Sequence, residues 1–261
     1  MASTITFTYG QIENHVGMQQ VGNIENHGFS EETLLRIQKQ FEDKSEMVYL
    51  GNVGNVNDKK ENACVLVIRN YLQSIEYCDE FIKEHKKVLK KCDTKALMRG
   101  RVVNKQARYN LCYADIGQEA EIEKGKGTIV SFSDLPFTNR IRKDIHSIIE
   151  KTETFETNGM PLAELNYYYS LKKCGIGYHG DTERRTVIGL RIHDIETLNE
   201  KMPIHFQWYY RHKPIDKEHY SIDLGHGDMY IMSNKAVGFD WKRSSIPTLR
   251  HATGVKKYTT V

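Results

Sequence analysis

The chain has 261 residues, of which 39% are hydrophobic and 27% are charged, and its formal net charge is +3. That content is sufficient for a substantial core and suits a soluble protein. No run of about 18 or more apolar residues is present, which excludes a membrane-spanning helix. The start MASTITFTYG lacks the basic and apolar regions of a signal peptide.

The first 97 residues are expected to be mainly helical. Ser30 has the character of an N-cap for a helix that continues to about Lys44. A second helix is expected from about Asn70 to Lys91. A third helix should begin near Asp134–Pro136, where isoleucines follow at helical spacing.

The five cysteines are odd in number, widely spaced and without a CxxC pair. Such spacing argues against a disulfide framework and against a zinc site. It indicates reduced thiols, and we therefore expect a cytoplasmic or nuclear protein that is not secreted.

Positive charge is concentrated between Lys83 and Arg108, where ten lysines or arginines stand against Glu84 and Asp93. The simpler interpretation is a solvated helix face followed by a loop. Clustered basic charge is also the electrostatic footprint of nucleic-acid binding, so the segment is a candidate for contacting phosphates. Its last part, RVVNKQARYNLCYAD, is expected to form one or two short strands.

From about Leu162 onward the sequence is typical of β-structure. Short aromatic and β-branched runs alternate with turn-forming segments; the runs are LAELNYYYS, TVIGLRI, IHFQWYYR, DMYIM and KKYTTV. Many short strands favour a sandwich or barrel, including the jelly roll. We expect an α+β protein with a double-stranded β-helix (jelly-roll) core over 98–261. The helices of 1–97 should pack on this core, in a single domain over 1–261, because no linker is visible.

The stretch GYHGDTE places His179, Asp181 and Glu183 at a spacing of two. On a strand, side chains two apart share one face, so an imidazole and two carboxylates would point the same way. Such a set is costly in a protein interior unless something positive lies there. Two histidines and one carboxylate on one side of a metal form the arrangement of non-haem Fe(II) oxygenases.

His251 is the expected second histidine of such a site. It lies in TLRHATG, an expected strand late in the chain, and a jelly roll brings late strands back beside early ones. The competing interpretation of the HxD pair is a hydrogen-bonded structural pair without a metal.

The carboxy-terminal part resembles the AlkB family of Fe(II)- and 2-oxoglutarate-dependent dioxygenases over roughly Met98 to Val261. LNYYYSLKKCGIGYHGDTE is similar to that family's Asn-x-Tyr strand, glycine-containing turn and His-x-Asp motif with a following acidic residue. LGHGDMYIMS resembles its HGD or HGS strand. VVNKQARYNLCYAD resembles the stretch with which family members handle the nucleotide.

The resemblance implies that Fe(II) is bound by His179, Asp181 and His251, with 2-oxoglutarate and O₂ as co-substrates. Oxidative decarboxylation to succinate and CO₂ would then accompany hydroxylation of a C–H bond. On a methyl group attached to a base nitrogen, the product would collapse to formaldehyde and a repaired base.

The resemblance also implies a binding site for 2-oxoglutarate. Asn166 and Tyr168, two apart on one strand, would contact it. Lys257 would take the place of the arginine that holds the distal carboxylate, with Thr259 on the same face. This departs from the family, because a lysine cannot form the bidentate fork and the second carboxy-terminal arginine has no counterpart. Arg243 stands near the place at which the family's distal histidine often occurs.

The substrate implied by the resemblance is an alkylated nucleobase in DNA or RNA, as in DNA repair. Glu183 would contact the base, although a surface carboxylate at a strand end is the simpler interpretation. Lys105 and Arg108 would meet phosphates. Tyr109 would stack on a base, unless it only fills the structure. We expect a monomer that binds nucleic acid and no membrane.

Two other functions remain open. The same iron site would serve a 2-oxoglutarate-dependent hydroxylase of a protein or a small molecule, which the lysine in place of arginine favours. A non-enzymatic jelly-roll binding module is the third hypothesis, in which the HxD pair is structural.

Overall fold

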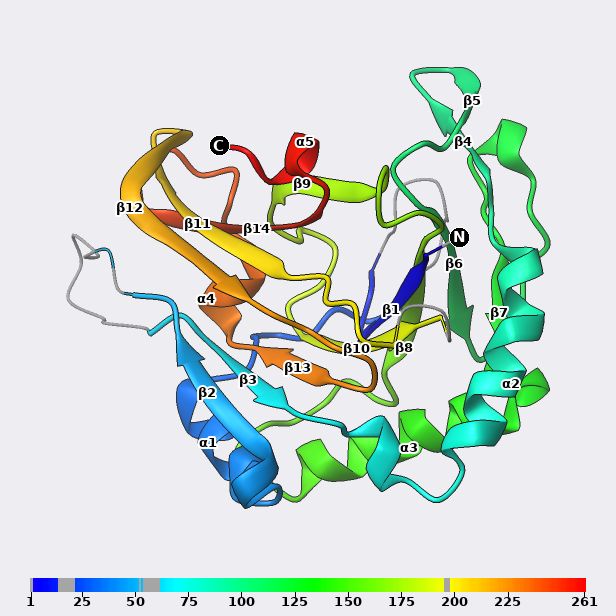
Figure 1. Ribbon diagram of the computed structural model, residues 1–261, viewed down its shortest axis with the longest axis horizontal. Helices are drawn as coiled ribbons and strands as arrows, with labels where there is room; N and C mark the ends of the chain where they lie inside the picture. Colours follow the sequence, from blue (N-terminus) through cyan, green and yellow to red (C-terminus); the bar gives the residue numbers. More distant parts are fainter. Residues whose placement is uncertain (1, 14–21, 52, 54–61, 195–197) are drawn as a thin grey trace.

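The computed structural model describes residues 2–13, 22–51, 53, 62–194 and 198–261, without the side chains of 216–218. These residues form a mixed α+β fold dominated by an eight-stranded and a four-stranded sheet (Figure 1). A separate hairpin of β4 (Lys95–Met98) and β5 (Arg101–Asn104) projects beyond the sheets. No helix in the described part of the chain is long and apolar enough to cross a membrane.

The large sheet collects strands from the whole length of the chain. Its neighbouring strands are antiparallel except for the last pair, which is parallel. In spatial order the strands are β2 (Ser45–Tyr49), β3 (Cys64–Ile68), β13 (Met229–Met232), β10 (Val187–His193), β1 (Thr4–Gly10), β8 (Leu162–Tyr168), β6 (Tyr109–Ala114) and β7 (Ile129–Ser131).

The small sheet comes entirely from the carboxy-terminal part. In spatial order its strands are β12 (Lys213–Ile222), β11 (Ile204–Tyr210), β14 (Thr248–Gly254) and β9 (Gly175–His179). Apolar side chains of both sheets pack against each other, among them Val67 and Met232 of the large sheet and Phe206 and Leu249 of the small one. The arrangement is compatible with a β-sandwich.

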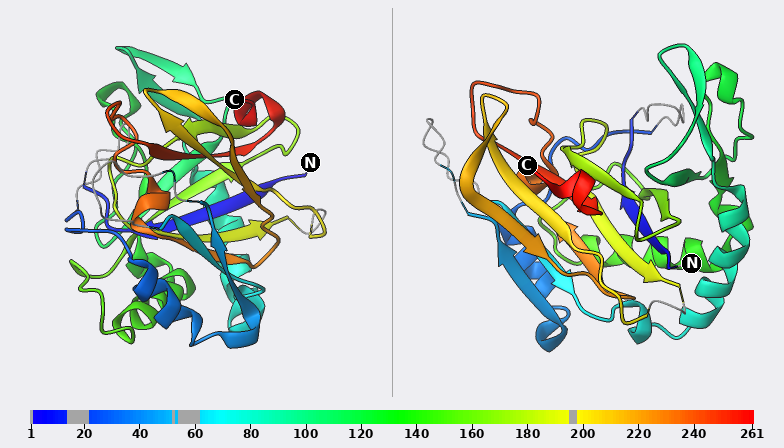
Figure 2. Two further views of the ribbon diagram at one scale, coloured as in Figure 1. Left: turned by 90° about the vertical axis from the view of Figure 1, so that its left-hand side faces the viewer. Right: turned by 45° about the horizontal axis from the view of Figure 1, so that its top comes forward.

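The expectation that residues 1–97 are mainly helical is wrong. The segment TITFTYG alternates threonine with Ile5, Phe7 and Tyr9, a period of two that suits a strand with two different faces. It forms β1, which pairs with β8 on one side and β10 on the other. In Figure 2 this blue strand lies beside the yellow β10, a strand that is far from it in the sequence.

The helices match the expected positions but are shorter. Ser30 is confirmed as an N-cap, since its side chain accepts a hydrogen bond from the N–H of Thr33. The second expected helix is broken at Ile75 and begins again at Cys78. The α-helices are α1 (Glu31–Gln38), α2 (Cys78–Val88), α3 (Pro136–Glu150), α4 (Asn234–Val237) and α5 (Lys256–Thr259); the 3₁₀ turns are η1 (Glu42–Lys44), η2 (Leu72–Ser74), η3 (Leu89–Lys91), η4 (Ile122–Lys124) and η5 (Phe132–Asp134).

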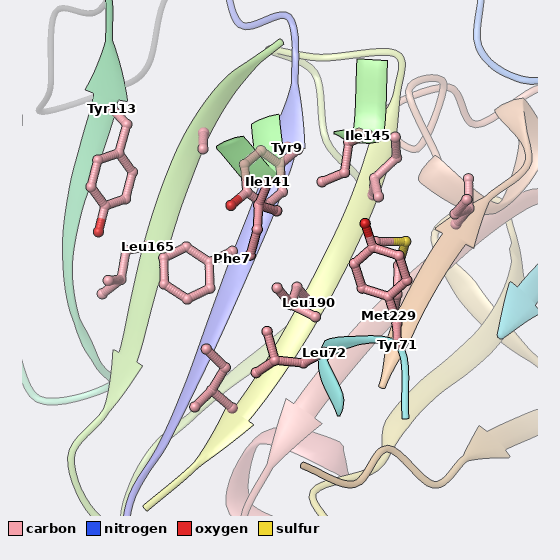
Figure 3. Close-up of a cluster of buried hydrophobic side chains, with 14 of the residues drawn as sticks. Phe7, Tyr9, Tyr71, Leu72, Tyr113, Ile141, Ile145, Leu165, Leu190 and Met229 are labelled. Atoms are coloured by element: carbon pink, nitrogen blue, oxygen red, sulfur yellow. The ribbon is translucent and has the colours of Figure 1, made fainter. Parts of the chain in front are cut away.

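The helices α1, α2 and α3 cover the outer face of the large sheet. Their apolar residues, such as Ile141 and Ile145, pack on the strand residues Phe7, Leu165 and Leu190 (Figure 3). The other face of the same strands therefore points toward the small sheet. There β1 presents threonines, and polar side chains replace the apolar ones.

Two strand expectations in the carboxy-terminal part are wrong. KKYTTV forms no strand, because Lys256–Thr259 are the helix α5. The segment HKPIDKEH, one of the turn-forming segments expected between the runs IHFQWYYR and DMYIM, begins with a tight turn and then enters β12. Arg211 and His212 hold the positive φ angles of 51° and 61° that this turn requires.

Candidate metal centre

Three side chains that could hold a metal ion come together at one end of the space between the sheets. His179, Asp181 and His251 each offer one ligand atom, and these atoms all lie within 4.8 Å of one another. Asp181 Oδ1 lies 3.6 Å from His179 Nε2 and 3.8 Å from His251 Nε2. With metal–ligand bonds of about 2.1 Å, ligand atoms on one side of a metal lie about 3.0–3.4 Å apart, so side-chain movements of about 1 Å would bring all three to coordination distance.

Strand pairing explains why the two histidines meet. His251 on β14 is the direct partner of His179, the last residue of β9, in the antiparallel register. The expectation that one strand continues through Asp181 and Glu183 is wrong, because β9 ends at His179. Asp181 is held instead by its loop, where its N–H donates to the carbonyl of Val237 over 3.1 Å.

Gly180 allows this loop to lie close to the segment after α4. A Cβ atom at position 180 would lie 2.1 Å from the carbonyl oxygen of Gly238 and 2.8 Å from Cβ of Trp241. Real Cβ contacts are never that short, so the residue between His179 and Asp181 must be glycine for both side chains to keep these positions.

Both histidines are oriented for binding a metal through Nε2. His179 Nδ1 lies 2.8 Å from the carbonyl of Gly177, and donation to it leaves the Nε2 lone pair free. Burial lowers the pKa of His251 well below its ordinary value, and the nearby His179 and Arg184 lower it further. His251 is therefore neutral at physiological pH, which is the metal-binding form.

The three side chains line a cavity of about 300 Å³ that receives residues from both sheets. Across the large sheet, Asn166, Thr6 and Arg191 are direct partners on β8, β1 and β10 and form one row on the cavity face. The next row toward the metal-binding end, from β8 to β13, consists of Glu164, Thr8, Gly189 and Tyr230.

Arg191 is a residue of this cavity that the sequence analysis missed. It is 1% exposed, its Nη1 contacts Met202 Sδ at 3.4 Å, and its Nε has no hydrogen-bond partner among the described residues. Burial lowers its pKa, although Tyr230, Tyr168 and the carboxylate of Asp228 act in the opposite direction, and an arginine stays charged in a protein. The signal in the sequence was an arginine within the otherwise apolar run TVIGLRI.

A buried charge is costly unless it is paired. In the described part of the chain no carboxylate forms an ion pair with Arg191. An anionic ligand in the cavity would supply the missing partner.

Lys257 and Thr259 lie outside the cavity. Lys257 is exposed on α5, with its Nζ 5.4 Å from the ring centroid of Tyr258. The chain turns at Gly254, whose φ is +108°, and β1 already fills the place between β8 and β10. No free edge is left there for a strand formed by KKYTTV.

Asn166 and Tyr168, expected to contact a co-substrate, do line the cavity from β8. Asn166 Oδ1 accepts a hydrogen bond from Nε of Arg108, which also lines the cavity. Burial raises the pKa of the Tyr168 hydroxyl, so this hydroxyl can donate a hydrogen bond at neutral pH.

Arg184 links the metal-binding carboxylate to the large sheet. Its Nη2 donates to Glu164 Oε2 over 2.7 Å, its Nε lies 3.5 Å from Asp181 Oδ2, and its Nη2 lies 3.7 Å from Glu183 Oε1. Burial acts to lower the pKa of Arg184, but the three carboxylates outweigh it and raise the pKa. Arg184 therefore remains a fixed positive charge behind Asp181.

The structure brings only some of the residues expected to contact a substrate to the cavity. Glu183 and Arg108 both line the cavity and are half-buried. Lys105 is also half-buried, and its Nζ donates to Oδ1 of Asn110. Lys105 is not among the residues that line the cavity, and this hydrogen bond holds it against β6 of the large sheet.

Tyr109 is not brought to the cavity. Successive residues of a strand point to opposite faces, and Tyr109 faces the helix side, where it packs on the large hydrophobic cluster. Its ring stacks on Tyr169 with centroids 4.3 Å apart and an interplanar angle of 20°. The expected role in stacking on a base is not supported by this placement.

The basic segment, from Lys83 to Arg108, contains the second half of α2 and the β4–β5 hairpin (Figure 1). All of its lysines and arginines except Lys105 and Arg108 are exposed. The hairpin tip holds Arg99 and Gly100 in left-handed conformations, at φ +50° and +77°, and exposes Met98. The segment therefore leads from an exposed helix face to Arg108 at the cavity.

Comparison with known proteins gives one full-length relative. The chain is 40% identical over 261 residues to "Uncharacterized protein R156" of Acanthamoeba polyphaga mimivirus, a match that covers 98% of this chain and 97% of that protein. No protein-family model matches the chain.

Proposed function

The chain belongs to the family of protein R156 of Acanthamoeba polyphaga mimivirus, and we propose that it is an Fe(II)- and 2-oxoglutarate-dependent dioxygenase. One observation carries the proposal. A His-Asp-His set and a buried arginine that forms no ion pair with any described carboxylate share a single cavity between two sheets. A divalent metal would satisfy the first group and a carboxylate the second.

The strand pairing supports a double-stranded β-helix as the core. β11 pairs with β12, β10 with β13 and β9 with β14, all antiparallel. These pairs are nested in the sequence, and successive pairs alternate between the small and the large sheet. A long hairpin wound into a helix has this pattern. The metal-binding candidates then lie at one end of the winding, on β9, β14 and the loop after β9.

The residues present fit the two groups that the reaction requires. His179, Asp181 and His251 would hold Fe(II) on one side and leave positions free, which is the ligand set of this class of oxygenase. When bound, iron, 2-oxoglutarate and O₂ together supply oxidative decarboxylation to succinate and CO₂, with the second oxygen atom inserted into a C–H bond.

Arg191 replaces Lys257 as the proposed partner of the distal carboxylate. An arginine can form two parallel hydrogen bonds to a carboxylate, which a lysine cannot. Asn166 lies in the same row as Arg191 with Thr6 between them, and the ring centroid of Tyr168 lies 6.0 Å from Cζ of Arg191; both residues would add hydrogen bonds. Arg184 keeps Asp181 oriented toward the two histidines while neutralising Glu164.

For the prime substrate we propose an alkylated nucleobase in DNA or RNA, by analogy with the AlkB family. Glu183 and Arg108 offer an acceptor and a donor beside the metal-binding end of the cavity. The exposed basic segment that ends at Arg108 would bind the phosphates of the same strand. Hydroxylation of an N-methyl group gives a hemiaminal, which releases formaldehyde and the unmodified base.

Succinate formation with Fe(II), 2-oxoglutarate and O₂ tests the proposal, across methylated oligonucleotides, methylated peptides and small molecules. Wild-type protein should form succinate, and Asp181→Ala should abolish it. Arg191→Met should raise the KM for 2-oxoglutarate at least tenfold, whereas Lys257→Met, the matched control, should leave it unchanged.

The outcomes separate the candidate functions. Stimulation by methylated oligonucleotides supports nucleobase demethylation. Stimulation by peptides or small molecules alone assigns the same site to a hydroxylase of another substrate. Failure of the wild type to bind Fe(II) or 2-oxoglutarate overturns the dioxygenase proposal and favours a non-enzymatic binding module.

A further inference from the structure

The strand pairs of the core are nested in the sequence, and the pattern predicts one further strand, paired with β8. The residues that follow β14 do not provide it. After the pairs β10·β13 and β9·β14, the next pair outward would join β8 to a strand that follows β14. The residues that follow β14 form the short helix α5 instead. The partner of β8 on that side is β1, at the opposite end of the sequence.

The first residues of the chain and the residues just after β14 contact the same loop, the one between β8 and β9. The N–H of Leu171 donates to the carbonyl of Ala2 over 3.0 Å, and the N–H of Val255 donates to the carbonyl of Cys174 over 3.1 Å. Leu171 and Cys174 are three residues apart, a span of about 10 Å at most. The amino-terminal strand therefore enters the large sheet close to the point at which the chain leaves β14.

β1 brings one side chain into the anionic part of the cavity. Thr6 is the direct partner of Asn166 on one side and of Arg191 on the other. Such partners have Cα atoms about 4.5–5.5 Å apart. Thr6 is 4% exposed and lines the cavity, and its hydroxyl has no hydrogen-bond partner among the described residues.

Thr6 and Arg191 thus place two buried donors without partners side by side, a hydroxyl and the guanidinium Nε. A ligand carboxylate that reached Arg191 would meet both of them.

We infer that β1 is the closing strand of the core and that Thr6 donates a hydrogen bond to the ligand carboxylate held by Arg191. The inference rests on the proposed function for the identity of that ligand as 2-oxoglutarate. It makes the amino-terminal strand β1, and not the segment that follows β14, the part of the chain that contributes Thr6 to the co-substrate site.

Calorimetric titration of 2-oxoglutarate into the full chain loaded with Mn(II) tests this inference, because it needs no turnover. Thr6→Val should weaken binding about tenfold, the effect of losing one hydrogen bond to a charged group. Thr6→Ser keeps the hydroxyl and should restore most of the affinity. The affinity for Mn(II) alone should be the same in all three proteins.

Thermal unfolding without ligand separates a binding role from a structural one. Thr6→Val removes a buried hydroxyl without a partner, so its Tm should stay the same or rise. Thr4→Val, the control on the same strand, removes a hydroxyl that donates to the carbonyl of Ile192 over 2.8 Å. Its Tm should fall, while its affinity for 2-oxoglutarate should not change.

Unchanged binding by Thr6→Val, with normal binding by the wild type, overturns the role of Thr6 and leaves the dioxygenase proposal standing. A fall in Tm equal to that of Thr4→Val would also overturn it, by assigning Thr6 a structural role. If the wild type with Mn(II) binds no 2-oxoglutarate, the proposed function fails and this inference fails with it.

Discussion

Arg184 and Glu164 form a buried ion pair directly behind the carboxylate of Asp181, a candidate metal ligand. Arg184 Nη2 lies 2.7 Å from Glu164 Oε2, and the two side chains are 2% and 5% exposed. Arg184 joins the loop after β9 to β8 of the large sheet, so the pair holds the metal-binding end of the cavity together.

Removing one partner of this pair should be strongly destabilising. Arg184→Met leaves the Glu164 carboxylate buried without its cation, and we expect a loss of about 3–5 kcal/mol in the free energy of unfolding. Urea denaturation of the metal-free protein at pH 7 measures it. The double variant Arg184→Met/Glu164→Gln should recover part of the loss, because neither charge remains.

The control for this prediction is an exposed ion pair, Lys124 with Glu121, whose side chains are 70% and 42% exposed. Lys124→Met should cause only a small change in the free energy of unfolding, because an exposed ion pair contributes little. A loss of that small size in Arg184→Met would contradict the importance assigned to the buried pair.

Gly180→Ala should weaken metal binding with little effect on the rest of the fold. The added Cβ would lie 2.1 Å from the carbonyl of Gly238, so the segment between His179 and Asp181 must shift. We expect at least a tenfold loss of affinity for Mn(II), measured by calorimetry.

Gly177→Ala is the matched control for this substitution. A Cβ at Gly177 meets nothing nearer than the Tyr258 carbonyl at 3.8 Å, an ordinary contact. Equal affinities of the two variants for Mn(II) would show that close packing at Gly180 does not position the ligands.

Stability should fall as the pH is lowered below about 6.5, in part because of His85. This side chain is buried on α2 between Phe81 and Tyr113, and burial lowers its pKa from 6.5 to about 3. The unfolded chain then binds a proton that the folded chain does not, so stability is complete above pH 6.5 and is lost toward pH 3. One such histidine removes about 2 kcal/mol between pH 8 and pH 5.

His85→Gln should therefore reduce the difference in unfolding free energy between pH 8 and pH 5 by that amount. Urea denaturation at the two pH values measures the difference, and the exposed His212→Gln is the control for removing an imidazole. An unchanged difference in His85→Gln would mean that His85 is not buried in the neutral form.

If nucleic acid is the substrate, the exposed lysines of α2 should contribute to the salt dependence of its binding. Each phosphate of a single strand that a lysine no longer neutralises lowers the slope of log affinity against log salt by about 0.7. Lys86→Ala/Lys87→Ala should show weaker binding and a flatter slope in fluorescence anisotropy titrations. Lys39→Ala/Lys151→Ala, a control pair that is exposed outside the basic segment, should match the wild type. Identical slopes for both double variants would remove the phosphate-binding role from α2.

Much of the local structure could be predicted from the sequence. The N-cap at Ser30, the start of α3 at Pro136 and the strand that carries His251 follow from capping preferences and side-chain periodicity, which act over a few residues. The ligand set was also predicted from residue types, since an HxD motif and a late histidine on a strand suffice to suggest a metal site. Its assembly is a finding of the structure.

What only the tertiary structure decided is which parts of the chain share the cavity. The resemblance to the AlkB family placed the carboxylate-binding cation at Lys257, because KKYTTV stands where that family has an arginine on its last core strand. In the structure β1 lies between β8 and β10, and it sets Thr6 beside the buried Arg191 of β10 on the cavity face. Strand pairing between distant segments depends on which sheet edges remain free, and no local pattern of residues records that.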